Sequence, residues 1–261
     1  MKNLLKKWLA EPLARGLDLD DPALFEVRKY ILRKKKFLRA IYAEWYQLLS
    51  DNVSEEPGIV LELGSGSGYA RESIPNLLSS EIVWIPDVSM VIDGCALPFS
   101  DHSVKAIVMT DVLHHIPQVR AFFSEAMRCL VPHGVVVMIE PWVSPWSIFI
   151  YKYFHHEQFD PDSAAWEFET SGPLSGANGA LPWMIFERDK SVFNAEFPLL
   201  SVETITPMMP FCYLLSGGLS VRGILPGFTY PWCRSFERLL DPWSEKLGMF
   251  AFIVLRRANY S

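Results

Sequence analysis

Short apolar runs divide the first half of the chain into elements of regular length. Three runs have the length of buried strands, at residues 59–63, 105–110 and 135–139. Weaker runs at 76–81 and 89–92 predict two further strands. Each run ends in polar or glycine-rich residues, as expected of strands that lead into turns.

An amphipathic helix is predicted between the strands at 105–110 and 135–139. Its apolar face is formed by Val119, Phe122, Phe123, Ala126, Met127 and Leu130. Strands that alternate with helices are typical of a parallel sheet with right-handed crossovers. The pattern therefore predicts an α/β fold with a doubly wound, mostly parallel sheet.

The regions on either side of these strands have a different residue pattern. Residues 1–56 read as a helical extension, in which a helix starts at Asp21-Pro22. Residues 57–141 read as the cofactor-binding core. Residues 142–261 read as a substrate-binding insertion, or lid, with the closing strands of the same domain. Within it we expect helices at 182–196 and 232–247 and strands at 199–206 and 249–255.

Composition narrows the class of protein. The 261 residues carry a formal net charge of -6, which argues against a nucleic-acid partner. The four cysteines form no C-x-x-C pair, which favours reduced thiols in a cytoplasmic protein. No run of about 18 apolar residues is present, and the N-terminus does not resemble a signal peptide. The basic face of the first helix favours a solvated surface, with attraction to an anionic substrate or membrane surface as the alternative.

The loop after the first strand has the chemistry of a ligand site. Gly64, Gly66 and Gly68 follow the strand as G-x-G-x-G, and Glu62 precedes the first glycine by two residues. Glycines let the backbone approach a ligand closely. A dinucleotide fingerprint requires glycine where this chain has Tyr69, and no G-K-[ST] follows. The spacing therefore disfavours NAD and excludes a phosphate-binding P-loop.

Three stretches resemble the class I S-adenosylmethionine-dependent methyltransferases, of the methyltransferase type 11-like group. They are VLELGSGSG, DGCALPFSDHSVKAIVMTDVLHHIP and FFSEAMRCLVPHGVVVMIEP, which occur in family order over residues 59–141. The resemblance implies a seven-stranded Rossmann-like sheet, S-adenosylmethionine as cofactor, and methylation as activity.

The resemblance also implies a cofactor site. The backbone of Gly64, Ser65, Gly66 and Gly68 is expected beside the methionine part, with Glu62 holding its amino group. Asp93 is expected to accept from the adenine amine. Cys95, Ala96 and Leu97 are expected around the ring, and Thr110 ends the fourth strand nearby.

Two acids compete to bind the ribose hydroxyls. Glu81 ends the second strand, whereas Asp87 has the more usual distance from the glycine loop. We prefer Glu81, because Asp87 lies only six residues before Asp93, which leaves no room for a crossover between them. The chain also departs from the family pattern in lacking most of the helix between the second and third strands. That departure opens one side of the adenine pocket.

A catalytic base is required only if the acceptor must lose a proton. Asp111, His114 and His115 follow the fourth strand and are candidates. His155 and His156 form a second cluster beside Glu157. Adjacent histidines on one helix point apart, so we expect no metal site.

The acceptor is not identified by the sequence. A small molecule or glycan precursor is our leading interpretation, with residues 141–231 as the acceptor pocket and its cover. The alternatives are a lipid-linked acceptor, which implies peripheral membrane contact, and a non-catalytic cofactor binder. Four tryptophans either line the pocket or belong to the core: Trp142, Trp146, Trp166 and Trp183. The oligomeric state stays open.

Overall fold

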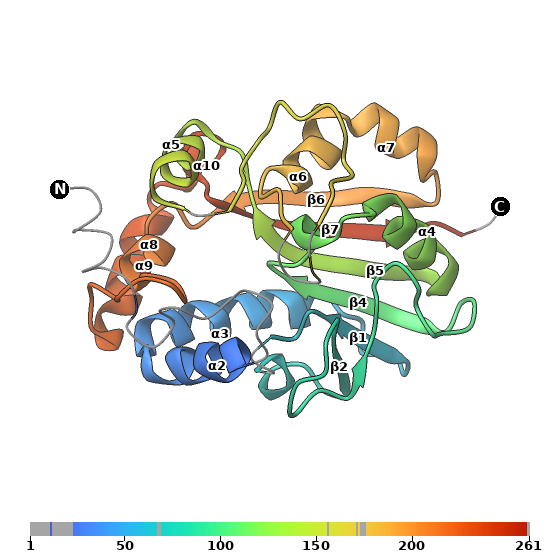
Figure 1. The fold of residues 1–261 in the computed structure, drawn as a ribbon, viewed down its shortest axis with the longest axis horizontal. Helices are drawn as coiled ribbons and strands as arrows, with labels where there is room; N and C mark the ends of the chain where they lie inside the picture. Colours follow the sequence, from blue (N-terminus) through green and yellow to red (C-terminus); the bar gives the residue numbers. More distant parts are fainter. Residues whose placement is uncertain are drawn as a thin grey trace.

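The chain folds around one mixed β-sheet (Figure 1). The computed structural model describes residue 11 and residues 23–66, 69–155, 157–170, 172 and 176–259. The sheet has seven strands in the order β3-β2-β1-β4-β5-β7-β6. Their bounds are β1 Ile59–Leu63, β2 Leu77–Glu81, β3 Met90–Val91, β4 Val104–Thr110, β5 Leu130–Pro141, β6 Leu200–Met208 and β7 Phe250–Arg257.

Strands β1 to β5 run parallel, and β7 runs antiparallel to both β5 and β6. The predicted seven-stranded, mostly parallel sheet is therefore confirmed. β5 is longer than the apolar run at 135–139, because its first residues also pair with β4 through Val104 and Leu130.

Helices cover both faces of the sheet, as its two-sided burial requires. Alternate residues of β5 point to opposite faces, so Val136 joins one hydrophobic core and Val137 the other. The longer helices are α2 Ala23–Lys34, α3 Lys36–Asp51, α4 Val119–Cys129, α5 Pro145–Phe154, α7 Lys190–Glu196 and α9 Tyr230–Arg238. Short helical segments are α6 Leu181–Trp183, η4 Met184–Arg188, α8 Cys212–Ser216 and α10 Ser244–Leu247.

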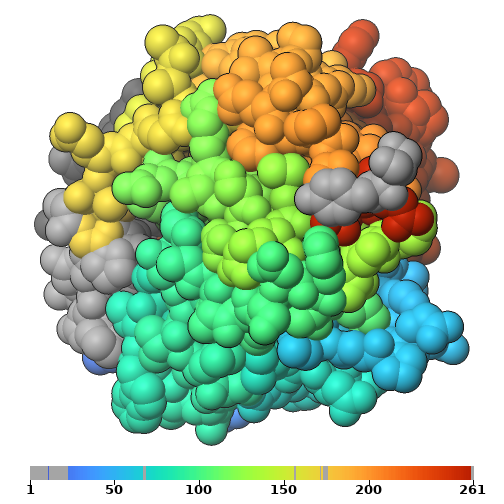
Figure 2. Space-filling model, turned by 90° about the vertical axis from the view of Figure 1, so that its right-hand side faces the viewer, coloured from blue at the N-terminus to red at the C-terminus, as the bar shows by residue number. Residues whose placement is uncertain are grey.

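The two faces bury different parts of the chain. Phe122 and Phe123 of α4 pack with Phe186 and Phe193, from the region of η4 and α7, on one face. Figure 2 shows the α7 region in orange above the green residues of the core. On the other face, Trp45 of α3 packs against Phe250 of β7.

The structure corrects three helix predictions. The N-terminal helix is divided at Lys35 into α2 and α3. The helix expected at 232–247 ends at Arg238, and Pro242 then lies in a short helical turn. Proline has no N–H and clashes with the preceding helical turn, so one continuous helix cannot form there. The short helix that the sequence predicts after the glycine loop, at residues 69–74, is reduced to a 3-10 turn, η2 Ala70–Glu72.

The N-terminal helices are bound to the C-terminal region by specific contacts. Tyr230 and Arg234 both donate to the carboxylate of Glu44 in α3. The Nζ of Lys35 donates to the carbonyl oxygens of Gly218 and Val221. Helix α3 thereby lies beside α8 and α9 (Figure 1). Tyr42 and Tyr46 of α3 and Tyr213 of α8 line one side of the candidate site.

Part of the basic face predicted for the first helix forms ion pairs within the molecule. Lys29 pairs with Asp87, Lys35 pairs with Glu11, and Arg39 pairs with Glu72. These pairs reduce the charge available to an anionic surface. None of the helices in the described ranges has the length and apolar character needed to cross a bilayer.

Candidate active site

A cavity of about 260 Å³ lies at the carboxyl ends of β1, β2 and β4. The order of the sheet reverses between β1 and β4, which is where open α/β sheets bind ligands. The glycine loop and the segments after β2, β3 and β4 line one part of the cavity. The other part is lined by residues from the two flanking regions, namely Phe25, Arg28, Tyr42, Tyr46, Tyr151, His155, Glu157, Tyr213, Leu219, Ser220 and Phe250.

Glycines in the loop after β1 serve two different purposes. Gly64 has a φ of 64°, and a Cβ built there would lie 2.5 Å from Cγ2 of Val112. Glycine is therefore required at this position for the close approach of β1 and the segment after β4. Gly66 has a φ of 51°, but its Cβ would meet nothing nearer than the Gly64 carbonyl oxygen at 3.9 Å. The bare backbone of Gly66 thus borders open space in the cavity.

Glu62 places a buried carboxyl group beneath this loop. Its side chain is almost fully buried, and its Oε2 has no hydrogen-bond partner among the described residues. Burial raises the pKa of Glu62 to about 7, because the charged form is poorly solvated there. A buried acceptor without a partner is costly, so the site favours a ligand that donates to it.

Glu81 connects the end of β2 to the glycine loop. Its Oε2 accepts from the Gly66 N–H at 3.0 Å, and its Oε1 accepts from the Ile82 N–H at 2.9 Å. Burial raises the pKa of Glu81. Each carboxylate oxygen can accept a second hydrogen bond, so Glu81 can still bind donors in the cavity.

Asp93 follows β3 and lines the same part of the cavity. Its Oδ1 accepts from the Cys95 N–H at 2.8 Å, which fixes the turn that carries the carboxylate. Thr110 ends β4, and its Oγ1 is buried without a partner in the described part of the chain. The two residues add an anionic and a neutral polar group to the lining.

Titratable side chains gather at the other part of the cavity. Asp111, His115, His155 and Glu157 all line it. Burial raises the pKa of Asp111 to about 6, and burial lowers the pKa of His115 to about 4. The Nδ1 of His115 lies 3.0 Å from the carbonyl oxygen of Gly176. A carbonyl only accepts, so this Nδ1 carries the proton and Nε2 is the basic nitrogen of the neutral ring.

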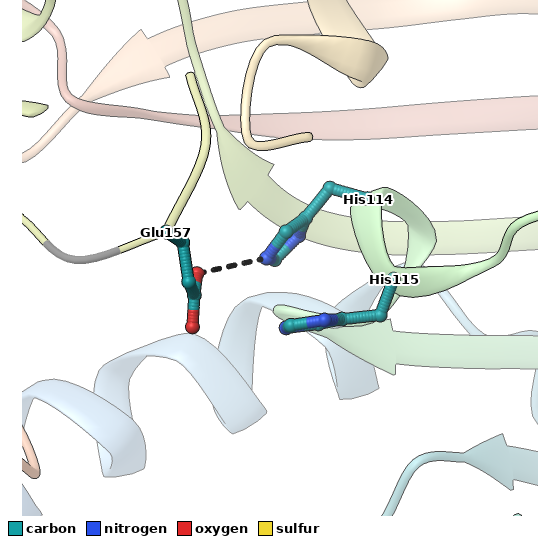
Figure 3. A group of neighbouring side chains, drawn as sticks. All are labelled: His114, His115 and Glu157. Carbon is teal, nitrogen blue, oxygen red and sulfur yellow. Dashed lines mark ion pairs between the residues drawn. The ribbon is translucent and has the colours of Figure 1, made fainter. Parts of the chain in front are cut away.

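His114 is held behind this surface between two carboxylates. Its Nδ1 lies 2.7 Å from Oε2 of Glu140, and its Nε2 lies 3.7 Å from Oε2 of Glu157 (Figure 3). The other oxygen of Glu140 accepts from the N–H groups of Val112 and Leu113. Burial alone would lower the pKa of His114, but its bonds to Glu140 and Glu157 raise it well above its usual value.

Comparison with known proteins assigns the core to a family. Residues 61–138 match the family described as "Methyltransferase domain". This match extends from β1 into β5 and includes the glycine loop, Glu81 and Asp93. The core of the chain at residues 61–138 is therefore similar to a methyltransferase domain, as the resemblance to the class I S-adenosylmethionine-dependent methyltransferases implies. The predicted family and its cofactor are thereby confirmed.

Two uncharacterized methyltransferases from strains of Mycobacterium leprae are 25% identical to this methyltransferase over 135 residues. The match covers 43% of this chain and 50% of each relative, so the chain spans about half the length of the curated relatives it matches. A solved structure of similar fold is a geranyl diphosphate C-methyltransferase from Streptomyces coelicolor A3(2). It is 14% identical, with a TM-score of 0.50, and the likeness covers 97% of this chain and 92% of that one. At this identity the likeness shows the fold alone.

Most residues predicted for the methyltransferase site line the one cavity. The group comprises Glu62, Gly64, Ser65, Gly66, Glu81, Asp93, Thr110, Asp111, His115 and His155. Gly68 and His156 lie outside the described residues. Their predicted roles stay predictions.

Other predicted residues lie elsewhere. Asp87 is exposed and pairs with Lys29, so only Glu81 of the two ribose candidates lines the cavity. The cavity lining does not include Cys95, Ala96 or Leu97, in contrast to the expected adenine wall. The turn held by Asp93 directs this segment toward α4, where the Leu97 N–H donates to Glu125. His114 is likewise absent from the lining, because it is buried behind His115.

The four tryptophans also fall outside the cavity. Trp142 and Trp166 are buried in the core, Trp183 packs against the same core, and Trp146 donates to the Pro210 carbonyl oxygen. The aromatic lining comes instead from four tyrosines and two phenylalanines, which the sequence reasoning missed: Tyr42, Tyr46, Tyr151, Tyr213, Phe25 and Phe250. Glu140 was also missed, although an acid that ends a predicted strand was a usable signal.

Proposed function

We propose that this methyltransferase transfers the methyl group of S-adenosylmethionine to a small-molecule acceptor held in the same cavity. The observation that carries the proposal is that both groups of residues line one cavity. Buried carboxylates and a bare glycine backbone line one part of the cavity, and tyrosines with a titratable cluster line the other. Cofactor and acceptor would therefore meet within one enclosed space.

The described residues fit the cofactor. Gly66 leaves open space beside the loop, and Glu62 offers a buried carboxyl oxygen without a partner. We assign Glu62 to the amino group of the cofactor, Glu81 to its ribose hydroxyls and Asp93 to its adenine amine. Each assignment pairs an acceptor in the lining with a donor on the ligand. When bound, the cofactor supplies an electrophilic methyl group on a sulfonium.

The acceptor part of the cavity supplies orientation and a proton acceptor. Tyrosine side chains present both an apolar ring and a hydroxyl, so they can position an acceptor with polar and apolar groups. Holding the acceptor close to the methyl group accounts for much of the expected acceleration. We assign proton acceptance to Asp111, whose side chain lines the cavity directly after β4. The surrounding aromatic residues exclude water, which limits side reactions.

A small molecule is favoured over a lipid-linked acceptor because several basic residues of the N-terminal helices form ion pairs within the protein. Lys29, Lys35 and Arg39 have internal partners, so they offer little free charge to a membrane. Arg28 lines the cavity, where it can meet an anionic group of a bound acceptor. The proposal therefore places any charge recognition inside the site.

Isothermal titration calorimetry with S-adenosylhomocysteine, S-adenosylmethionine and NAD tests the cofactor assignment. We expect one equivalent of either S-adenosyl ligand to bind and NAD to give no heat. Absence of binding at about millimolar ligand would refute the site, and the ligand should then also leave the melting temperature unchanged.

The acceptor class is tested by incubating the enzyme with isotope-labelled S-adenosylmethionine and two extract fractions. One fraction holds water-soluble metabolites and the other holds lipids. We expect the label in the soluble fraction and its loss with the Asp111→Asn variant. Label only in the lipid fraction would support the lipid-linked alternative, and label in neither would support the non-catalytic one.

A further inference from the structure

Two histidines and one glutamate converge at the edge of the cavity. His114, His115 and Glu157 each offer a ligand atom, and these atoms lie within 4.8 Å of one another (Figure 3). The histidines are in the turn Leu113–His115, after β4, whereas Glu157 comes from the segment after α5. The methyltransferase fold brings the two segments together, and neither has a metal-ligand spacing of its own.

Both histidines are held with one nitrogen available to a ligand. His114 Nδ1 bonds to the Glu140 carboxylate, and His115 Nδ1 bonds to the Gly176 carbonyl. Both partners accept hydrogen bonds, so each Nδ1 is the donor, and each Nε2 carries the lone pair when the ring is neutral. A metal ion bound at His114 Nε2 would replace the proton that this nitrogen otherwise holds beside Glu157. Histidines that bind metals in proteins usually donate their second nitrogen to a carboxylate or a backbone carbonyl in this way.

A buried nitrogen without a hydrogen bond marks the centre of the group. The His114 ring is 1% exposed, and its Nε2 has no hydrogen-bond partner in the described ranges. This nitrogen faces Oε2 of Glu157 across 3.7 Å. Ligand atoms of a tetrahedral ion with bonds of about 2.0–2.1 Å lie roughly 3.4 Å apart. The distance between His114 and Glu157 is therefore close to the value that an ion requires.

The divergence that we expected of the adjacent His155 and His156 does not apply to His114 and His115. The rings of His114 and His115 have centroids 4.1 Å apart, and both are directed toward Glu157 (Figure 3). They lie in a tight 3-10 turn whose geometry differs from that of an α-helix. Adjacent side chains can therefore converge on one point.

We propose that His114, His115 and Glu157 hold a divalent transition-metal ion. Two imidazole nitrogens and one carboxylate oxygen suit Zn²⁺ or Fe²⁺ better than Mg²⁺ or Ca²⁺, which prefer oxygen ligands. His115 and Glu157 line the cavity, so a fourth position on the ion would face the acceptor part. An acceptor oxygen bound there would be oriented toward the methyl group and would lose its proton more readily. The assignment goes beyond the proposed function, which includes no metal ion.

Metal binding is tested directly on untagged protein, because a histidine tag would bind the same ions. The protein is treated with a chelator and dialysed, then titrated with Co²⁺ while visible absorption is recorded. We expect one equivalent of tetrahedral Co²⁺, displaced by Zn²⁺, and one equivalent of Zn²⁺ by elemental analysis. Absence of the absorption bands, with substoichiometric Zn²⁺ after dialysis, would overturn the proposal.

Matched variants assign the binding to these residues. His115→Ala and Glu157→Gln should each weaken Co²⁺ binding by at least about 10-fold, and Glu140→Gln should weaken it by about 10- to 100-fold through His114. His133→Asn alters an exposed histidine far from the group and should bind as the unmodified protein does. Retention of the bands in the variant that combines His115→Ala with Glu157→Gln would also overturn the proposal.

S-adenosylhomocysteine binding serves as the folding control. Glu157→Gln should keep its affinity for this ligand, since the carboxylates assigned to the cofactor are unchanged. A variant that lost both ligands would be scored as unfolded, and the metal stoichiometry of the unmodified protein would then decide. Failure to bind S-adenosylhomocysteine with retained Co²⁺ binding would refute the cofactor assignment and leave the metal site standing.

Discussion

The pH dependence of cofactor binding should report on Glu62. Burial raises the pKa of this carboxyl group to about 7 in the protein without ligand. S-adenosylhomocysteine carries an ammonium group that would pair with the ionised carboxylate and lower that pKa in the complex. Binding should therefore strengthen as pH rises toward the pKa of Glu62 and level off above it.

The size of the effect follows from the ionised fraction of Glu62. With a pKa of about 7, roughly 3% of the carboxyl groups are ionised at about pH 5.5 and roughly 75% at about pH 7.5. Affinity should then rise by about 20-fold over this interval. Calorimetry in buffers of different ionisation enthalpy should also detect release of nearly one proton per ligand at about pH 6.

The free energy of unfolding of the protein without ligand should depend on pH in the opposite direction to the affinity. The folded-state pKa of Glu62 lies above the ordinary pKa of a glutamate, about 4.5, so the folded state holds the proton more tightly than the unfolded chain does. The contribution of Glu62 to the free energy of unfolding is therefore full below about pH 4.5. It falls as pH rises through about 7, by about 3 kcal/mol in total.

The Glu62→Gln variant is the control, because it keeps the shape of the side chain and removes its titration. Its affinity for S-adenosylhomocysteine should be lower and nearly independent of pH over the same interval. Asp111→Asn should keep the slope of the unmodified protein, since Asp111 is assigned to the acceptor. An unchanged slope in Glu62→Gln would refute the assignment of Glu62 to the amino group.

Three further substitutions test the rest of the cofactor site. Gly66→Val should abolish binding of S-adenosylhomocysteine in a protein that still folds, because a side chain would enter the cavity. Calorimetry measures the binding, and thermal unfolding shows that the variant folds. Glu81→Ala should lose about 1.5–3 kcal/mol of binding free energy, whereas Asp87→Ala should lose almost none, and equal losses would contradict the placement of Glu81. Asp93→Ala should also weaken binding by about 1.5–3 kcal/mol in calorimetry. Normal affinity in this variant would exclude a contact between Asp93 and the adenine amine.

Local sequence was sufficient for the part of the cavity to which we assign the cofactor. Glu62, Gly64 and Gly66 lie within one strand and its loop, so an apolar run followed by glycines determines their arrangement. Glu81 and Asp93 follow other strands of the parallel sheet, and the carboxyl ends of such strands meet at one edge. Chain length also favoured Glu81 over Asp87, since a crossover requires more residues than the interval to Asp93 contains.

The expected adenine wall shows where local reasoning fails. Cys95, Ala96 and Leu97 are adjacent to Asp93, yet hydrogen bonds direct their segment toward α4. Arg128 of α4 donates to the carbonyl of Leu97 and strengthens that attachment. Sequence proximity to a ligand-binding residue does not specify which side of a turn faces the ligand.

The sequence by itself determined the family, the parallel sheet and the glycine loop, because each depends on residues that are close together in the chain. Only the tertiary structure decided the part of the cavity to which we assign the acceptor. Tyr42 comes from α3, Tyr213 from α8 and Phe250 from β7, and no periodic pattern relates these positions. Likewise, His114 meets Glu140 and Glu157 only after β5 and the segment beyond α5 have packed against the turn after β4. Contacts between distant segments depend on the packing of whole helices and strands, which local hydrophobic patterns do not encode.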